Sequence, residues 1–152
     1  MKIIKDAYHV AKSVTSYHIS TKDNNTIVTD VDINVENFLI AQIKSKFEDD
    51  NFLTEENNPG GKLKNRTWII DPIDGTAYFV KESCNWGIQL AFYDNENTRF
   101  SVIYLPITDE LYYAAENQGA FVNNNKILHR KEVPLNQAIV EFGGTLYKNL
   151  EH

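Results

Sequence analysis

The spacing of apolar residues near the N-terminus predicts two amphipathic helices. In the first, residues 3–17, apolar side chains recur every three or four positions: Ile3, Ile4, Ala7, Val10, Ala11, Val14 and Tyr17. The second is expected to begin near Thr29, whose hydroxyl can cap the first turn, with Asp32 three positions later as an acidic form of the capping box. Its buried stripe would be Val31, Val35, Phe38, Leu39 and Ile43. The polar, turn-rich residues 16–26 are expected to form a loop.

After residue 66 the pattern changes to that of strands joined by short turns. The continuous apolar run at 68–70 is typical of a strand covered on both faces. Residues 86–93 place their large apolar side chains on one face, and further strands are predicted at residues 99–105, 110–115, 120–122 and 127–128. The sequence therefore predicts an α+β fold, in which the two N-terminal helices cover one face of a mainly antiparallel sheet.

The segment that separates the helices from these strands has no periodicity. Residues 56–66, ENNPGGKLKNR, contain Pro, a Gly pair and three basic side chains. We expect a mobile loop there, and loops of this length often border a functional site.

Composition narrows the functional classes. The net charge is -6, with 15 basic residues scattered among 21 acidic ones, which argues against a nucleic-acid partner. The single cysteine, Cys84, excludes an internal disulfide and favours a reducing, cytoplasmic location. Charges throughout the first 14 residues argue against a signal peptide or a membrane span. Residues 150–152 are interpreted as an expression-tag remnant, which leaves residues 1–149 as the domain.

The stretch WIIDPIDGTAYF, residues 68–79, carries the chemistry. Pro72 removes a ladder donor, so the chain is expected to leave the sheet at Asp71, with Asp74 close to the strand exit. Gly75 permits a positive φ, and Thr76 supplies a hydroxyl where a short helical turn begins.

In this stretch, carboxylates and an anion-binding site are expected to be adjacent. Backbone N–H groups at the start of a helical turn can bind a phosphate without basic side chains. Two carboxylates beside a phosphate would repel it unless a hard divalent cation lay between them, and oxygen ligands suit Mg²⁺ or Mn²⁺.

This stretch resembles the first signature of the inositol monophosphatase family, the Mg²⁺-dependent, lithium-sensitive phosphatases related to fructose-1,6-bisphosphatase. Residues 27–36 (IVTDVDINVE), 52–56 (FLTEE) and 102–127 resemble further segments of the family, so the resemblance covers nearly the whole chain. It implies the fold of the N-terminal half of that family. Thr54 stands where the family usually has Gly, and Tyr78 where it often has Asn.

The resemblance also implies a set of metal ligands. Glu55, Asp71 and the carbonyl of Ile73 would bind one cation, and Asp71 and Asp74 would share a second. Because the carboxyl ends of strands 52–55 and 68–71 can be neighbours in one sheet, we expect Glu55, Asp71 and Asp74 to converge.

A catalytic and a phosphate-binding set follow from the same resemblance. Glu55 and Thr76, with Asp32, would orient and deprotonate the attacking water. The backbone N–H groups of Gly75 and Thr76 would hold the phosphate.

The leading hypothesis is an Mg²⁺-dependent phosphomonoesterase that hydrolyses a small phosphorylated metabolite: an inositol phosphate, a sugar phosphate or a 3′-phosphoadenosine nucleotide. A non-catalytic metal-binding or regulatory domain and a purely structural α+β module are the alternatives. The family's second signature, a Trp-Asp pair, does not occur, since Ile69 follows Trp68 and Gly87 follows Trp86. The chain is therefore expected to be the N-terminal part of such an enzyme, nearly inactive alone, and to form a homodimer through an exposed apolar surface.

Overall fold

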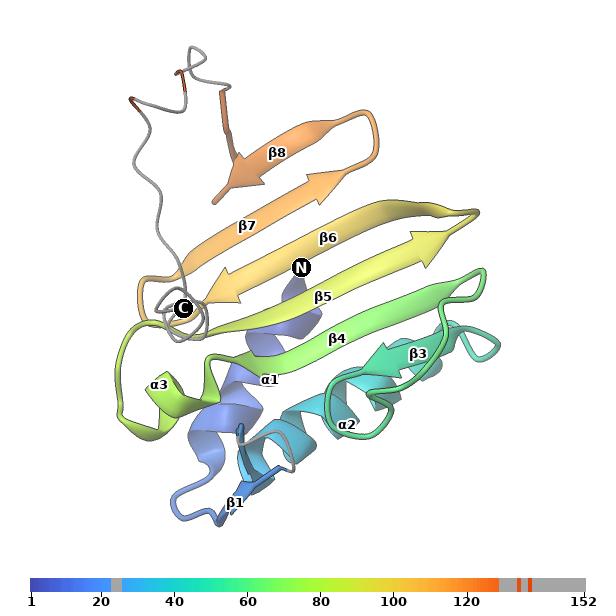
Figure 1. Cartoon of the computed structure of the whole chain (residues 1–152). Helices are drawn as coiled ribbons and strands as arrows, with labels where there is room; N and C mark the ends of the chain where they lie inside the picture. Colours follow the sequence, from blue (N-terminus) through green and yellow to red (C-terminus); the bar gives the residue numbers. More distant parts are fainter. Residues whose placement is uncertain (23–25, 129–133, 135–136, 138–152) are drawn as a thin grey trace, which may run out of the picture.

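Two helices lie side by side against a large sheet in the computed structural model, which describes residues 1–22, 26–128, 134 and 137 (Figure 1). The helices and the short third helix are α1 (Lys2–Ser13), α2 (Asp30–Lys44) and α3 (Thr76–Val80). The interpretation of residues 150–152 as a tag remnant lies outside the described residues. Among the described residues, no helix is long and apolar enough to cross a bilayer.

The large sheet has seven strands whose spatial order follows the sequence. They are β3 (Asn51–Thr54), β4 (Thr67–Asp74), β5 (Gly87–Asp94), β6 (Asn97–Leu105), β7 (Glu110–Ala115), β8 (Gly119–Val122) and β9 (Asn125–Lys126). Strand β3 runs parallel to β4, and every later neighbour is antiparallel. The predicted α+β fold, with helices on a mainly antiparallel sheet, is confirmed.

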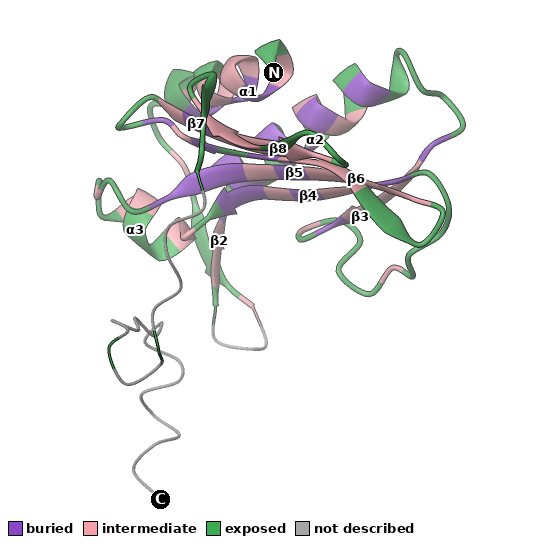
Figure 2. Ribbon diagram, turned by 90° about the horizontal axis from the view of Figure 1, so that it is seen from above, coloured by how far each residue is buried: buried purple, intermediate pink, exposed green. Residues whose placement is uncertain are grey.

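The hydrophobic core lies between the helices and one face of the sheet (Figure 2). Helix α1 contributes Ile4 and Ala7, and α2 contributes Val35 and Leu39, all fully buried. Of the large residues predicted to share one face at 86–93, Trp86, Ile88 and Leu90 are buried in the core. A core built from one stripe per helix and one sheet face leaves the opposite sheet face for other contacts.

The N-terminal elements differ from the prediction at two places. Helix α1 ends at Ser13 rather than residue 17, because Val14 is already extended (φ -83°, ψ 113°). The predicted loop contains a hairpin of β1 (Ile19–Thr21) and β2 (Ile27–Thr29). Both strands consist largely of β-branched residues, which favour strands more than their polar neighbours favour a loop.

The start of α2 is as predicted. Thr29 caps the helix and accepts a hydrogen bond from the backbone N–H of Val31, while Asp32 accepts one from the backbone N–H of Thr29. This capping box fixes the first turn of α2 directly after strand β2.

Strand β4 continues past the predicted exit. Asp71 pairs with Gln89 and Asp74 pairs with Gly87, so three steps on β4 face two on β5. This mismatch is a bulge, and Pro72 lies within it, where no ladder donor is required. The last predicted strand, at 127–128, is instead β9 at residues 125–126.

Candidate metal and phosphate site

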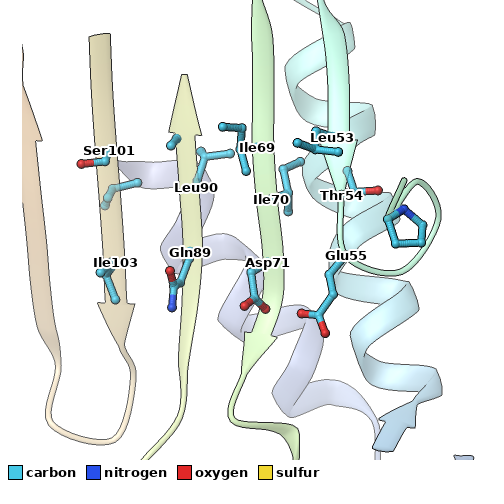
Figure 3. Close-up of a pocket in the computed structure, with 13 residues that line it drawn as sticks. Leu53, Thr54, Glu55, Ile69, Ile70, Asp71, Gln89, Leu90, Ser101 and Ile103 are labelled. Atoms are coloured by element: carbon cyan, nitrogen blue, oxygen red, sulfur yellow. The ribbon is translucent and has the colours of Figure 1, made fainter. Parts of the chain in front are cut away.

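Parallel pairing of β3 with β4 brings Glu55 next to Asp71. Thr54 lies opposite Ile70, and the backbone N–H of Glu55 donates to the carbonyl of Ile70 at 3.1 Å. The carboxylates of Glu55 and Asp71 face each other at the carboxyl ends of the two strands (Figure 3). These two residues, 16 positions apart, form the centre of the candidate site.

Asp71 occupies an environment that disfavours a bare carboxylate. The pKa of Asp71 is raised to about 8. Burial is the largest cause, followed by the charge of Glu55, a hydrogen bond with Glu55, and the charges of Asp74 and Asp32. Its Oδ1 is buried and has no hydrogen-bond partner. A buried acceptor without a partner is costly, so this oxygen marks a position where a cation or a donor would be stabilising.

Asp74 is directed elsewhere. It is exposed beyond the β4 bulge, and the side-chain amide of Gln89 donates a hydrogen bond to its Oδ2. Among the described residues, no group of three or more Asp, Glu, His or Cys side chains is already arranged to hold a metal ion. The structure thus brings Glu55 and Asp71 together, whereas Asp74 is within reach of their charge but bonded to Gln89.

Gly75 makes the sharp connection from β4 to α3. Its φ of 87° lies in the left-handed region, as its sequence position predicts. A Cβ on Gly75 would lie 2.8 Å from the carbonyl oxygen of Asn85, so the position also requires a missing side chain.

Thr76 contacts two of the other residues expected at the site. Its Oγ1 lies 2.9 Å from Asp32 Oδ1 and 3.0 Å from the carbonyl oxygen of Ile73. Asp32 is 1% exposed, and its Oδ2 accepts from the backbone N–H of Thr29 at 2.8 Å. One carboxylate oxygen of Asp32 therefore takes part in the capping box, and the other accepts a hydrogen bond from Thr76.

Sequence reasoning missed the role of Glu36. This α2 residue is fully buried, and its carboxylate accepts the backbone N–H groups of Glu56 and Asn57, each at 2.9 Å. The turn after β3 is thereby fixed immediately beyond Glu55. The available signal was a glutamate one helical turn after Asp32, next to the apolar residue Val35.

Sequence reasoning also missed Lys22, which follows β1. Its Nζ lies 3.0 Å from Glu55 Oε1 and 2.8 Å from Glu56 Oε1. Burial raises the pKa of Glu56 and the ion pair with Lys22 opposes that rise. No local pattern in residues 16–26 indicated this long-range contact.

A shallow pocket of about 420 Å³ extends from the two acids across the uncovered sheet face (Figure 3). Its floor includes Leu53, Ile69 and Ile103, while Gln89 and Asp71 form its polar end. The arrangement places acids suited to a hard cation beside an apolar surface and the Gly-Thr turn.

The same α+β fold occurs in solved structures of phosphatases. The model of the inositol monophosphatase family matches residues 1–149, and the chain belongs to that family. The family expected from the sequence is therefore confirmed.

Individual relatives agree with this assignment. The chain is 37% identical over 134 residues to an inositol-1-monophosphatase of Bacillus subtilis, covering 86% of this chain and 50% of the relative. It is 33% identical to a fructose-1,6-bisphosphatase/inositol-1-monophosphatase of Thermotoga maritima, covering 82% of this chain and 50% of the relative.

Solved structures show the same likeness. An IMPase from Thermotoga maritima superposes with a TM-score of 0.77 at 32% identity, over 83% of this chain and 50% of the other. An IMPase/NADP phosphatase complexed with Mg²⁺ and phosphate gives a TM-score of 0.72 at 29% identity, over 80% and 48%. The chain spans about half the length of the relatives it matches.

Proposed function

We propose that this chain is the N-terminal half of an Mg²⁺-dependent phosphomonoesterase that acts on a small phosphorylated metabolite. The observation that carries the proposal is the facing pair of carboxylates, Glu55 and Asp71, with Asp71 Oδ1 buried and unpaired. A hard divalent cation is the partner such oxygens accept most readily, and Mn²⁺ has the same ligand preference. The family and a neighbour solved with Mg²⁺ and phosphate support this choice.

The proposed ligands are those implied by the resemblance to the inositol monophosphatase family. Glu55, Asp71 and the carbonyl of Ile73 would hold one cation, and Asp71 and Asp74 a second after Gln89 releases Asp74. A bound Mg²⁺ would lower the pKa of water and offset charge on the phosphate oxygens.

The protein's own groups would prepare the nucleophile and hold the substrate. Thr76 donates its hydroxyl hydrogen to Asp32, which leaves lone pairs on Thr76 Oγ1 to accept a hydrogen bond from the attacking water and orient it. Glu55 would share in orienting that water. The backbone N–H groups of Gly75 and Thr76 would bind the phosphate at the turn into α3.

The substrate class remains broad within this proposal. Inositol phosphates, sugar phosphates and 3′-phosphoadenosine nucleotides each present a monoester of the required kind. Relatives described as acting on inositol phosphates, fructose 1,6-bisphosphate or NADP support that range. A lithium-inhibited complex of a related staphylococcal enzyme supports lithium sensitivity. We also propose a cytoplasmic location.

We further propose that the 152-residue chain has little activity alone. Two carboxylates converge among the described residues, which is few for a strongly hydrated Mg²⁺.

The sheet face opposite α1 and α2 carries an apolar pocket floor, which supports formation of a homodimer in which that face is buried.

The decisive experiment measures phosphate release from inositol monophosphate, a sugar phosphate, a 3′-phosphoadenosine nucleotide and an aryl phosphate in excess Mg²⁺. The 152-residue chain is compared with a longer protein that contains it, with and without Asp71→Asn. Asp49→Asn, at an exposed residue outside the site, is the matched control. Turnover by the longer protein that is lost only in Asp71→Asn supports the phosphatase, whereas Mg²⁺ binding without turnover would support the non-catalytic alternative.

A further inference from the structure

A lysine lies inside the acidic cluster of the candidate site. Lys22 Nζ contacts Glu55 and Glu56 at once, at 3.0 Å and 2.8 Å. The lysine side chain is 23% exposed and that of Glu56 is 7% exposed. The contact with Glu56 is therefore shielded from solvent, whereas the Glu55 side chain, which is 43% exposed, remains open to solvent and to an incoming cation.

The surrounding charge is one-sided. The pKa of Asp71 is raised by the negative charges of Glu55, Asp74 and Asp32. The charges of Glu55 and Asp32 also raise the pKa of Glu56. Within the part of the chain that the structure describes, Lys22 is the one cationic side chain paired with any of these acids. It therefore supplies the nearest positive charge at the place where a metal would bind.

The position of Lys22 is set by the hairpin that precedes α2. Its backbone N–H donates to the carbonyl oxygen of Thr26 at 2.7 Å, and β1 pairs with β2 in a register that ends at Thr29. Thr29 in turn caps α2 and bonds Asp32. The lysine thus reaches Glu55 from an element anchored to the rest of the site.

Resting on the metal site proposed above, we infer that Lys22 is a built-in counterion that competes with the first divalent cation for Glu55 and so sets the metal affinity of the site. Its ammonium group occupies Glu55 Oε1, an oxygen that a cation would need. Metal binding to this oxygen would displace the contact. Glu56, whose carboxylate is more buried, keeps the displaced ammonium close by.

Two consequences follow from this competition. Without metal, Lys22 offsets part of the repulsion among the acids and stabilises the fold. With metal bound, the positive charge of Lys22 would repel the cation and weaken its binding.

The test measures binding of Mn²⁺ alone to the 152-residue chain, by the electron paramagnetic resonance signal of free Mn²⁺ and by calorimetry. We expect Lys22→Met to bind Mn²⁺ about tenfold more tightly, because repulsion between neighbouring charges is removed. Lys22→Gln should behave similarly, because it also removes the charge while keeping a polar side chain. Lys22→Arg should stay within about twofold of the wild type, because the charge is retained. Lys46→Met removes the same charge at an exposed site beyond the far end of α2 and should change nothing.

Thermal unfolding provides a second readout. Lys22→Met should melt below the wild type without metal and should gain more from added Mn²⁺ than the wild type does. Equal or weaker Mn²⁺ binding by both Lys22→Met and Lys22→Gln would overturn the counterion role and leave the proposed metal site intact. Absence of Mn²⁺ binding by every variant and by the wild type would overturn both.

Discussion

Thr76 Oγ1 lies 2.9 Å from Asp32 Oδ1, although 44 residues separate the two in the chain. The contact joins the start of α2 to the start of α3, next to the bulge that ends β4. Asp32 is already fixed by the capping box, so Thr76 meets an oxygen whose position does not depend on α3. The hydroxyl is thereby oriented before any ligand arrives.

Replacement of Thr76 by Val tests this orientation. The folded state should lose about 2 kcal/mol of unfolding free energy, because Asp32 is 1% exposed and one oxygen of its buried carboxylate would lose this donor. In a longer, active form of the protein, kcat should fall roughly 100-fold or more, as on removal of a general acid–base group. Mn²⁺ affinity should stay within about twofold, and Thr76→Ser should retain activity. A kcat unchanged in Thr76→Val would remove Thr76 from the proposed mechanism.

The unfolding of the metal-free chain should depend on the protonation of Asp71. Its pKa rises from 3.8 to about 8 on folding, so the folded state binds more protons than the unfolded state between these values. The contribution of Asp71 to the unfolding free energy should therefore be largest below pH 4, decline as pH rises, and be lost above pH 8. The expected loss is on the order of 2 kcal/mol, because each pKa unit corresponds to about 1.4 kcal/mol and partial exposure screens the effect.

Urea unfolding from pH 4 to pH 9 measures this decline. Asp71→Asn should flatten the profile and be more stable than the wild type at pH 8. Added Mg²⁺ should stabilise the wild type at pH 8 but not Asp71→Asn. A parallel decline in both proteins would assign the pH dependence to other groups.

Glu36 is expected to support the site through the backbone after Glu55. Glu36→Gln replaces one of two acceptors with a donor that faces a backbone N–H, which should cost about 2 kcal/mol of unfolding free energy. Mn²⁺ affinity of the variant, measured where it is fully folded, should fall at least about fivefold because Glu55 is less fixed. Glu48→Gln, at an exposed position, serves as the control and should match the wild type. Loss of stability with unchanged Mn²⁺ affinity would limit Glu36 to a structural role.

Gly75→Ala should destabilise the turn into α3. The added Cβ would require a left-handed backbone at φ 87° and a 2.8 Å approach to the Asn85 carbonyl, so we expect a cost of about 2 kcal/mol. Gly60→Ala is the matched control, since nothing lies within 4 Å of a Cβ there. Chemical denaturation of both variants gives the comparison, and equal stability of the two would show that the turn can relax.

Local patterns were sufficient for several features that depend on immediate neighbours, although they missed the end of α1 and the β1–β2 hairpin. The capping box at Thr29, the alternation along β5 and the positive φ of Gly75 were all predictable, since each depends on the geometry of one turn or one strand. The bulge in β4 was not predicted, because it depends on the register of β5 opposite.

The sequence by itself determined the fold class, the family, and the acids and turn that the site would use, because hydrophobic periodicity and the DPIDGT stretch are local properties of the chain. Only the tertiary structure decided how these acids are paired. It bonded Asp74 to Gln89, away from Glu55 and Asp71, and brought Lys22 to Glu55 and Glu56. Such pairings depend on which strands become neighbours and on which charges must be neutralised once water is removed, and neither is encoded in the spacing of residues along one segment.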